Sequence, residues 1–219
     1  MNKKRVLIIL AVFLLLISTT ATAKRELTGD NLELQQREDG QVVFAEGNVE
    51  LIYDQLRITA EDEGIYYRYN GDIEFRKNVK FFYQQYEGES LELTGNIEEE
   101  IFHLIDQVKI KGPESYLEAD RVDVYQAENR MEAHDNTYLE YNDFWAEADK
   151  IIYYLDREFI HLEGNVRGER DGQKFSSNAA DINQKTEEVN LSGQAKLVLP
   201  EEESSANGEE SAGAEENDN

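Results

Sequence analysis

The side chains that could carry out chemistry are three histidines, His103, His134 and His161, set among many carboxylates. An enzyme would need a nucleophile beside a base, a pair of carboxylates with distinct roles, or a cluster of metal ligands. The sequence contains no glycine-rich phosphate loop, no serine elbow and no zinc-binding motif. With 47 Asp and Glu residues, any carboxylate pair could be chosen arbitrarily. We therefore predict that the protein is not an enzyme and has no catalytic residue, metal site or cofactor.

The sequence repeats with a period of 29 or 30 residues, which is typical of a stack of similar structural units. Apolar residues recur five and three residues before, and one and three residues after, an anchor position. Because these offsets are odd, the four apolar columns share the face of a strand that lies opposite the anchors. Only Thr137 and Gly168 interrupt them. The anchors are Asn48, Asn78, Gln107, Asn136, Asn165 and Gln194.

Each repeat predicts a β-hairpin. Alternation over Val43–Tyr53 predicts a half-buried strand, and Asp54 and Gln55 separate it from a second strand over Leu56–Ala60. The second strands of the first four repeats carry a small residue twelve positions after the anchor, namely Ala60, Ser90, Ala119 and Ala148, and an acid follows three of them. The apolar parity then shifts, as a bulge or corner would cause. In the fifth repeat the matching pair, Ala180-Asp181, comes three residues late, which we assign to an insertion within 168–172.

No segment after the amino terminus shows helical periodicity beyond two turns. The repeats therefore predict an all-β fold of about six repeated hairpins, roughly a dozen short antiparallel strands, in one elongated domain. A hairpin with one apolar face cannot bury that face alone. Stacked hairpins that face a second layer can do so.

The amino terminus has the order of a secretory signal peptide. Three basic residues are followed by an apolar run from Val6 to Ile17 and by a small-residue site ending at Ala23. We predict cleavage after Ala23, export to a periplasm, and a mature domain over residues 24–199. An uncleaved amino-terminal anchor is the alternative. Residues 200–219 carry eight acids and no base, which predicts a disordered acidic tail.

The formal net charge of −25 becomes about −28 once the three basic residues of the signal peptide are removed. No basic patch of the nucleic-acid-binding type is present, so nucleic acid is excluded as a partner. The histidines precede anchors by even offsets, and we therefore place them on the polar face as ordinary surface residues.

The apolar columns are the remaining candidate site. They fit either a solid sandwich core or an interior lined for lipid. The first and last strands of a stack have unpaired backbone groups, so neighbours could add there, at Leu32–Leu34 and Gln194–Leu199. The candidate ligand-binding side chains are Phe75, Phe81, Phe102, Leu104, Ile110, Met131, Leu139, Tyr141 and Leu162.

Several recurring pieces resemble the OstA-like (LptA-type) family of periplasmic lipopolysaccharide transport proteins. They are Ala45-Glu46-Gly47-Asn48-Val49, Leu117-Glu118-Ala119-Asp120 and Leu162-Glu163-Gly164-Asn165-Val166. The resemblance implies a twisted β-jellyroll of two facing antiparallel sheets. It also implies that lipopolysaccharide acyl chains lie between the sheets and that protomers, or homologous jellyrolls, join head to tail through edge strands.

The leading hypothesis is therefore a periplasmic bridge that carries lipopolysaccharide from the inner to the outer membrane through a hydrophobic groove. Two alternatives stay open. One is a structural β-repeat protein with a solid core and no lipid cargo, and the other is an inner-membrane-anchored, LptC-like component.

Overall fold

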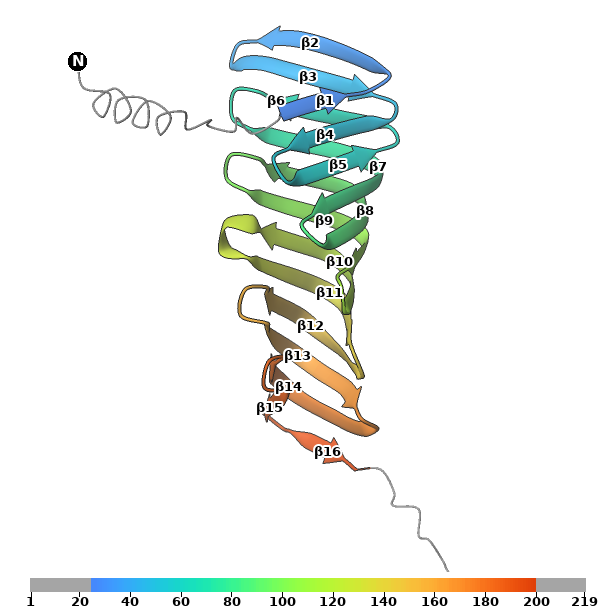
Figure 1. The fold of residues 1–219 in the computed structure, drawn as a ribbon, viewed down its shortest axis with the longest axis vertical. Coiled ribbons are helices and arrows are strands. Elements are labelled where there is room, and N and C mark those ends of the chain that lie inside the picture. Colours follow the sequence, from blue (N-terminus) through green and yellow to red (C-terminus); the bar gives the residue numbers. More distant parts are fainter. Residues whose placement is uncertain (1–24, 200–219) are drawn as a thin grey trace, which may run out of the picture.

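The computed structural model describes residues 25–199 as one antiparallel sheet of sixteen strands. Hairpins stack along the long axis from β2 at one end to β16 at the other (Figure 1). The expected signal peptide with its cleavage after Ala23, and the expected acidic tail 200–219, lie outside the described residues. Within residues 25–199, no helix has the length and apolar character needed to cross a membrane.

The strands at the two ends of the stack are short. At the amino-terminal end they are β1 (Arg25–Thr28), β2 (Asn31–Arg37), β3 (Gly40–Glu46), β4 (Val49–Tyr53), β5 (Leu56–Ala60) and β6 (Glu63–Tyr67). At the carboxy-terminal end they are β15 (Glu188–Ser192) and β16 (Lys196–Val198).

Between them, eight long strands form the body. These are β7 (Asp72–Tyr83), β8 (Tyr86–Asn96), β9 (Ile101–Lys111), β10 (Ser115–Tyr125), β11 (Arg130–Tyr141), β12 (Phe144–Tyr154), β13 (Phe159–Arg170) and β14 (Gln173–Asn183). One 3₁₀ turn, η1 (Gln126–Glu128), joins β10 to β11.

The sheet folds over along a corner that crosses every long strand near its centre, so its two halves face each other. Arm A contains β1, β4, β5, β16 and the halves of the long strands next to turns 84–85, 112–114, 142–143 and 171–172. Arm B contains β2, β3, β6, β15 and the other halves. The expected β-jellyroll of two facing layers is confirmed, and the two layers are parts of one continuous sheet.

The repeat anchors form this corner. All six anchors have positive φ angles between 47° and 55°, and the residue before each anchor is also left-handed. In the four hairpins formed by the long strands, the two left-handed residues give the first strand one residue more than its partner and shift the register, for example between Arg76 and Val79. Asn is among the non-glycine residues that adopt this conformation most readily.

The corner corrects the prediction of an unbroken strand over Val43–Tyr53, because β3 ends at Glu46 and β4 begins at Val49. The assignment of faces still holds. The corner takes up two left-handed residues, and because two is an even number, the apolar side chains before and after it point to the same face. The side-chain amide of the anchor also secures the corner. Asn78 Nδ2 donates to Glu61 (2.8 Å), and Asn136 Nδ2 donates to Asp120 (2.7 Å).

The small residue and acid of the second strand lie at the same corner, as predicted, but the fifth repeat was misassigned. Its corner is Ser177-Asn178, where Val166 pairs with Ser177 as Thr137 pairs with Ala148. No insertion is present, and Ala180-Asp181 pairs with Leu162 and His161 on arm B. Ser177 fits because the position requires only a small side chain, as Ser90 does in the second repeat, and Asn178 takes the place of the acid.

Candidate functional site

The predicted ligand-binding residues line the space between the two arms. Phe81, Ile110 and Leu139 come from arm A, whereas Phe75, Phe102, Leu104, Met131 and Leu162 come from arm B. All eight are at most 5% exposed, and Tyr141 packs against them from the edge of arm A. The apolar columns therefore form one interior, as the odd offsets predict.

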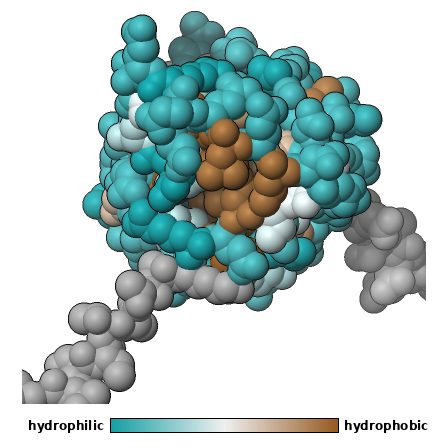
Figure 2. All heavy atoms as spheres, turned by 90° about the horizontal axis from the view of Figure 1, so that it is seen from above, coloured by the Kyte–Doolittle hydropathy of each residue, from teal (hydrophilic) through white to brown (hydrophobic). Residues whose placement is uncertain are grey.

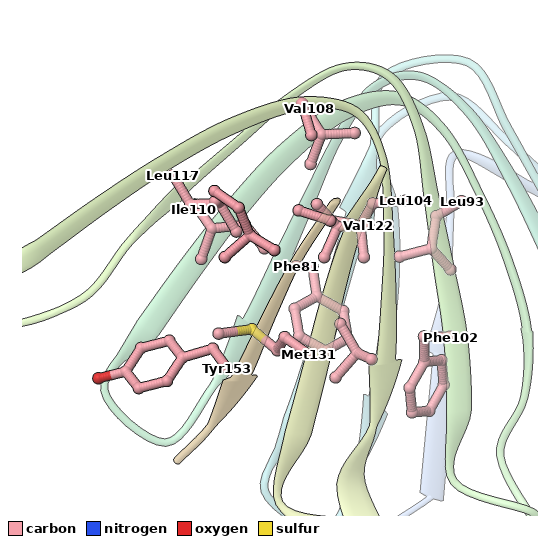
Figure 3. Close-up of a cluster of buried hydrophobic side chains, with 14 of the residues drawn as sticks. Phe81, Leu93, Phe102, Leu104, Val108, Ile110, Leu117, Val122, Met131 and Tyr153 are labelled. Atoms are coloured by element: carbon pink, nitrogen blue, oxygen red, sulfur yellow. The ribbon is translucent and has the colours of Figure 1, made fainter. Parts of the chain in front are cut away.

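The middle of this interior is closed. Figure 3 shows side chains from both arms pointing toward one another, among them Phe81 and Phe102, whose ring centroids lie 5.6 Å apart. Phe75, Leu104 and Leu162 expose 1% or less, so neither solvent nor a water-sized void touches them. An acyl chain could lie here only if the arms moved apart.

The two interruptions of the columns have local explanations. Thr137 is 2% exposed, and its hydroxyl donates to the Ala148 carbonyl (2.7 Å), so its polar atom is satisfied. At Gly168 an added Cβ would lie 2.5 Å from the Phe175 ring. Phe175 therefore fills the volume that an apolar side chain occupies at this position in other repeats.

The second strands of the hairpins contribute as much to the interior as the first. The candidate set was drawn from the first strands, and it missed the fully buried Leu93, Val122 and Ile151. Their burial could have been predicted from the parity shift, since all three continue the apolar alternation of the second strand after its small residue.

The interior opens at both ends of the stack. At the amino-terminal end a cavity of about 330 Å³ is lined by Leu27, Leu34, Val43 and Leu51 together with tyrosines. Figure 2, which looks onto this end, shows hydrophobic side chains at the centre of a hydrophilic ring. A similar cavity of about 320 Å³ at the other end is lined by Phe175, Val189, Leu191 and Leu197.

A third opening lies on the side opposite the corner, where the hairpin turns of the two arms approach each other. This lateral cavity, of about 500 Å³, has Phe144 of arm A and Ile182 of arm B beside polar residues that include Arg170. The Arg170 guanidinium crosses to Glu187 Oε2 (3.2 Å), and at the other end Arg25 pairs with Glu98 (3.0 Å).

Tyr153 belongs to the same open side. Burial raises the pKa of the Tyr153 hydroxyl, and the nearby Tyr86 hydroxyl of arm A raises it further. Tyr153 is therefore a neutral, polar-tipped side chain between the arms. Sequence reasoning did not identify Tyr86 or Tyr153, because both lie near turns outside the anchor-based columns.

The histidines lie on the outer face of arm B, where His103 and His161 contact carboxylates at hydrogen-bond distance and His134 Nε2 lies 3.4 Å from Asp123 Oδ2. His103 Nδ1 lies 2.6 Å from Asp123 Oδ1, and His161 Nδ1 lies 2.5 Å from Asp181 Oδ1. Burial alone would raise the pKa of Asp123, but hydrogen bonds from Arg121 and His103 outweigh it and lower the pKa. No group of three or more His, Asp or Glu residues within 25–199 is arranged to hold a metal ion.

The fold and the site define an elongated β-jellyroll with an apolar interior that opens at both ends. Residues 26–188 match the family described as "LptA/(LptD N-terminal domain) LPS transport protein". Since this match covers most of the chain, the protein belongs to that family of lipopolysaccharide transport proteins. The resemblance seen in the repeated Gly-Asn-Val and Ala-Asp pieces is thereby confirmed.

The structure is similar to the crystal structure of LptH from Pseudomonas aeruginosa, described as the LptA-homologous periplasmic component of the conserved lipopolysaccharide transport device. The TM-score is 0.52 at 12% sequence identity, over 54% of this chain and 96% of that chain. This likeness supports the β-jellyroll fold. No curated protein matches the chain in sequence.

Proposed function

We propose that the protein is a periplasmic bridge that carries lipopolysaccharide from the inner to the outer membrane, with the acyl chains held between arms A and B. The observation that carries this proposal is the continuity of the apolar interior, which runs through the repeats and opens at both ends. The residues proposed to contact the acyl chains are those predicted from the sequence, together with Leu93, Val122 and Ile151 of the second strands.

Loading requires the arms to part, and the contacts across the open side are weak enough to allow this. Arg25 and Glu98 are both about half exposed, and Glu187 is 78% exposed. Exposed ion pairs contribute about 0–1 kcal/mol each. Burying an acyl chain of a dozen carbons gains on the order of 10 kcal/mol gross, at about 0.8 kcal/mol per methylene. This gain exceeds the cost of breaking these ion pairs, and the acyl chain would replace the apolar contacts, such as that of Phe81 with Phe102, that the arms lose when they part.

The open side also gives the polar part of the molecule a place outside the core. In the lateral cavity, Phe144 and Ile182 face the interior, while Asn142, Arg170 and Asn183 supply hydrogen-bonding groups. An amphiphile could place its tails between the arms there and leave its sugars in water.

Bridging would use the two edges of the sheet. The β1–β2 edge exposes Leu32 (49%) and Leu34 (60%), and the β16 edge exposes Leu197 (54%). Adding the β16 edge of one protomer to the β1–β2 edge of another, or of a homologous jellyroll, would extend both the backbone ladder and the apolar interior.

A second candidate function is a structural repeat protein with a solid core and no lipid. The observation that favours it is the closed middle, where Phe75, Phe102 and Leu104 are sealed. The third candidate, a membrane-anchored component, is tested by sequencing the mature amino terminus, because cleavage after Ala23 excludes an amino-terminal anchor.

Retention of lipopolysaccharide by delipidated protein, measured by native mass spectrometry, tests the proposal. Phe102→Glu places a charge in the interior and should abolish retention. The matched control is Phe82→Glu, since Phe82 lies on the outer face of arm A beneath Arg57 (5.1 Å from the guanidinium to the ring). Circular dichroism checks that both variants fold. Failure of the unaltered protein to retain lipopolysaccharide would favour the solid-core function.

A further inference from the structure

The outer face of arm A carries three aromatic side chains that the core does not use. Tyr116, Tyr138 and Trp145 alternate with buried neighbours and are half-buried on the solvent side of β10, β11 and β12. The rings of Tyr138 and Trp145 are stacked, with centroids 6.4 Å apart and planes at 24°. We call these three residues the aromatic strip.

Glutamates flank every ring of the strip across the strands. Tyr116 pairs with Glu140 on one side and Lys111 on the other, Tyr138 pairs with Glu118 and Glu147, and Trp145 pairs with Glu140 and Glu169. These pairings follow from the strand registers.

The tyrosine hydroxyls of the strip donate to two of these glutamates, Tyr116 to Glu118 and Tyr138 to Glu140. For Tyr116, burial and then the Glu118 bond raise the pKa to about 12. For Tyr138, the Glu140 bond and then burial raise the pKa to about 12. The rings therefore stay neutral at physiological pH and sit beside carboxylates.

Five other partly exposed rings in residues 25–199 each lie against an arginine, whereas no described cation lies over Tyr138 or Trp145. An arginine guanidinium lies 4.1–5.4 Å from each of these ring centroids. The pairs are Arg25–Tyr53, Arg37–Phe44, Arg57–Phe82, Arg130–Tyr125 and Arg157–Tyr154.

No described arginine or lysine lies over Tyr138 or Trp145, although carboxylates beside a ring strengthen the attraction for a cation. Lys109 and Arg167 pair with Glu118 and Glu147. No ion pair within residues 25–199 reaches Glu140 or Glu169. The strip thus combines unoccupied ring faces with uncompensated negative charge.

A polar groove of about 800 Å³ runs beside the strip along the corner. Its lining includes Tyr138, Asp149 and the ion pair of Glu147 with Arg167, and it crosses the sheet from β10 toward the corner at Gln194. Strands lie about 4.8 Å apart, so the groove spans about 20 Å, the length of about six residues of extended chain. A groove of this length is too long for a single ammonium ion, and it matches the length of an extended peptide.

We propose that the aromatic strip and its groove bind an extended basic segment of a partner protein. Arginine or lysine side chains of that segment lie over Tyr138 and Trp145 and pair with Glu140 and Glu169. The site is on the outer face, so it is independent of the lipid proposed for the interior.

Trp145 is the single tryptophan of the chain and reports directly on this site. Titration of the purified protein with an eight-residue peptide of alternating arginine and serine should give a saturable change in Trp145 emission. Glu140→Gln with Glu169→Gln, which removes the two glutamates without an ion pair in residues 25–199, should raise the Kd at least tenfold. Glu87→Gln with Glu89→Gln removes the same charge from arm A near Lys80, where pairs are satisfied, and should change the Kd less than twofold.

Three results would overturn the proposal. They are the absence of a saturable change, equal weakening by the two double variants, and displacement of the peptide by spermine at equal total charge. The last two would show that net charge alone attracts the peptide. Binding of a fluorescent peptide, followed by anisotropy, adds a test of the ring: Trp145→Ala should weaken it severalfold, and unchanged binding would contradict the role of the strip.

Discussion

The middle of the molecule and its two ends use the same sequence pattern with opposite results. Leu139 and Leu197 occupy the same repeat position, three residues after an anchor, yet Leu139 is 1% exposed and Leu197 is 54% exposed. The difference is the next strand, which Leu139 has on both sides and Leu197 has on one. At the ends, apolar side chains that are buried in the middle therefore remain exposed, and the strands of a neighbouring jellyroll could cover them.

The largest expected effect contrasts these two leucines directly. Leu139→Ala should lower the free energy of unfolding by 2–5 kcal/mol, at about the usual cost of truncating a buried leucine. Leu197→Ala should change it by less than about 0.5 kcal/mol, because the side chain is largely in water. Urea denaturation of both variants measures the difference, and equal losses would show that the end is as closed as the middle.

A second contrast concerns association at the ends. Leu34→Asp or Leu197→Asp should weaken end-to-end association at least tenfold, because a charge would replace apolar contact at the joint. Leu91→Asp is the control, since Leu91 is 37% exposed but lies at the corner, away from both ends. Sedimentation velocity measures the association. If Leu91→Asp weakens it equally, the edges are not the joint.

The smallest expected effect concerns the outer face of the middle repeats, where a buried carboxylate should make the free energy of unfolding depend on pH. Asp123 and Glu132 pair directly across β10 and β11, are at most 9% exposed, and are compensated by surrounding bases. Because the pKa of Asp123 is lowered on folding, its contribution is present above about pH 4 and is lost as the pH falls further.

Asp123→Asn should therefore cost about 1 kcal/mol at pH 7, and this difference from the unaltered protein should shrink below pH 4. Asp181→Asn is the matched control, because Asp181 bonds His161 in the same way but its side chain is 46% exposed. That variant should cost less than about 0.5 kcal/mol. Denaturation at pH 3 and pH 7 checks both, and a pH-independent loss in Asp123→Asn would refute the assigned cause.

Much of this organisation could be predicted from the sequence. The apolar alternation of one strand is weak evidence alone, but it recurs at the same positions in every 29-residue repeat. The apolar columns, the hairpin turn at Asp54-Gln55 and the exposed edges could all be predicted. The corner at the anchors could not, because two left-handed residues preserve the alternation that revealed the strands. The corner at Ser177-Asn178 could not be predicted either, because Asn178 replaces the acid that follows the small residue in three other repeats.

The candidate site shows the same division. The burial of Phe102 and Leu162 could be predicted, because both lie at odd offsets from an anchor and therefore on the apolar face of a strand. The closed middle, the lateral cavity beside Arg170 and the contact of Tyr86 with Tyr153 depend on how far the arms approach each other. That distance is set by packing between residues far apart in the chain, and no local pattern encodes it.

The position of the acyl chain is the most direct test of the central claim. Trp145 lies on the outer face, so the native protein already carries a fluorophore that lipid in the interior should not reach. A second protein, Phe102→Trp with Trp145→Phe, places the fluorophore between the arms. Lipopolysaccharide with brominated acyl chains should quench the interior tryptophan strongly and leave Trp145 nearly unchanged. Quenching of Trp145 alone, or of neither tryptophan under conditions where the lipid binds, would contradict the account.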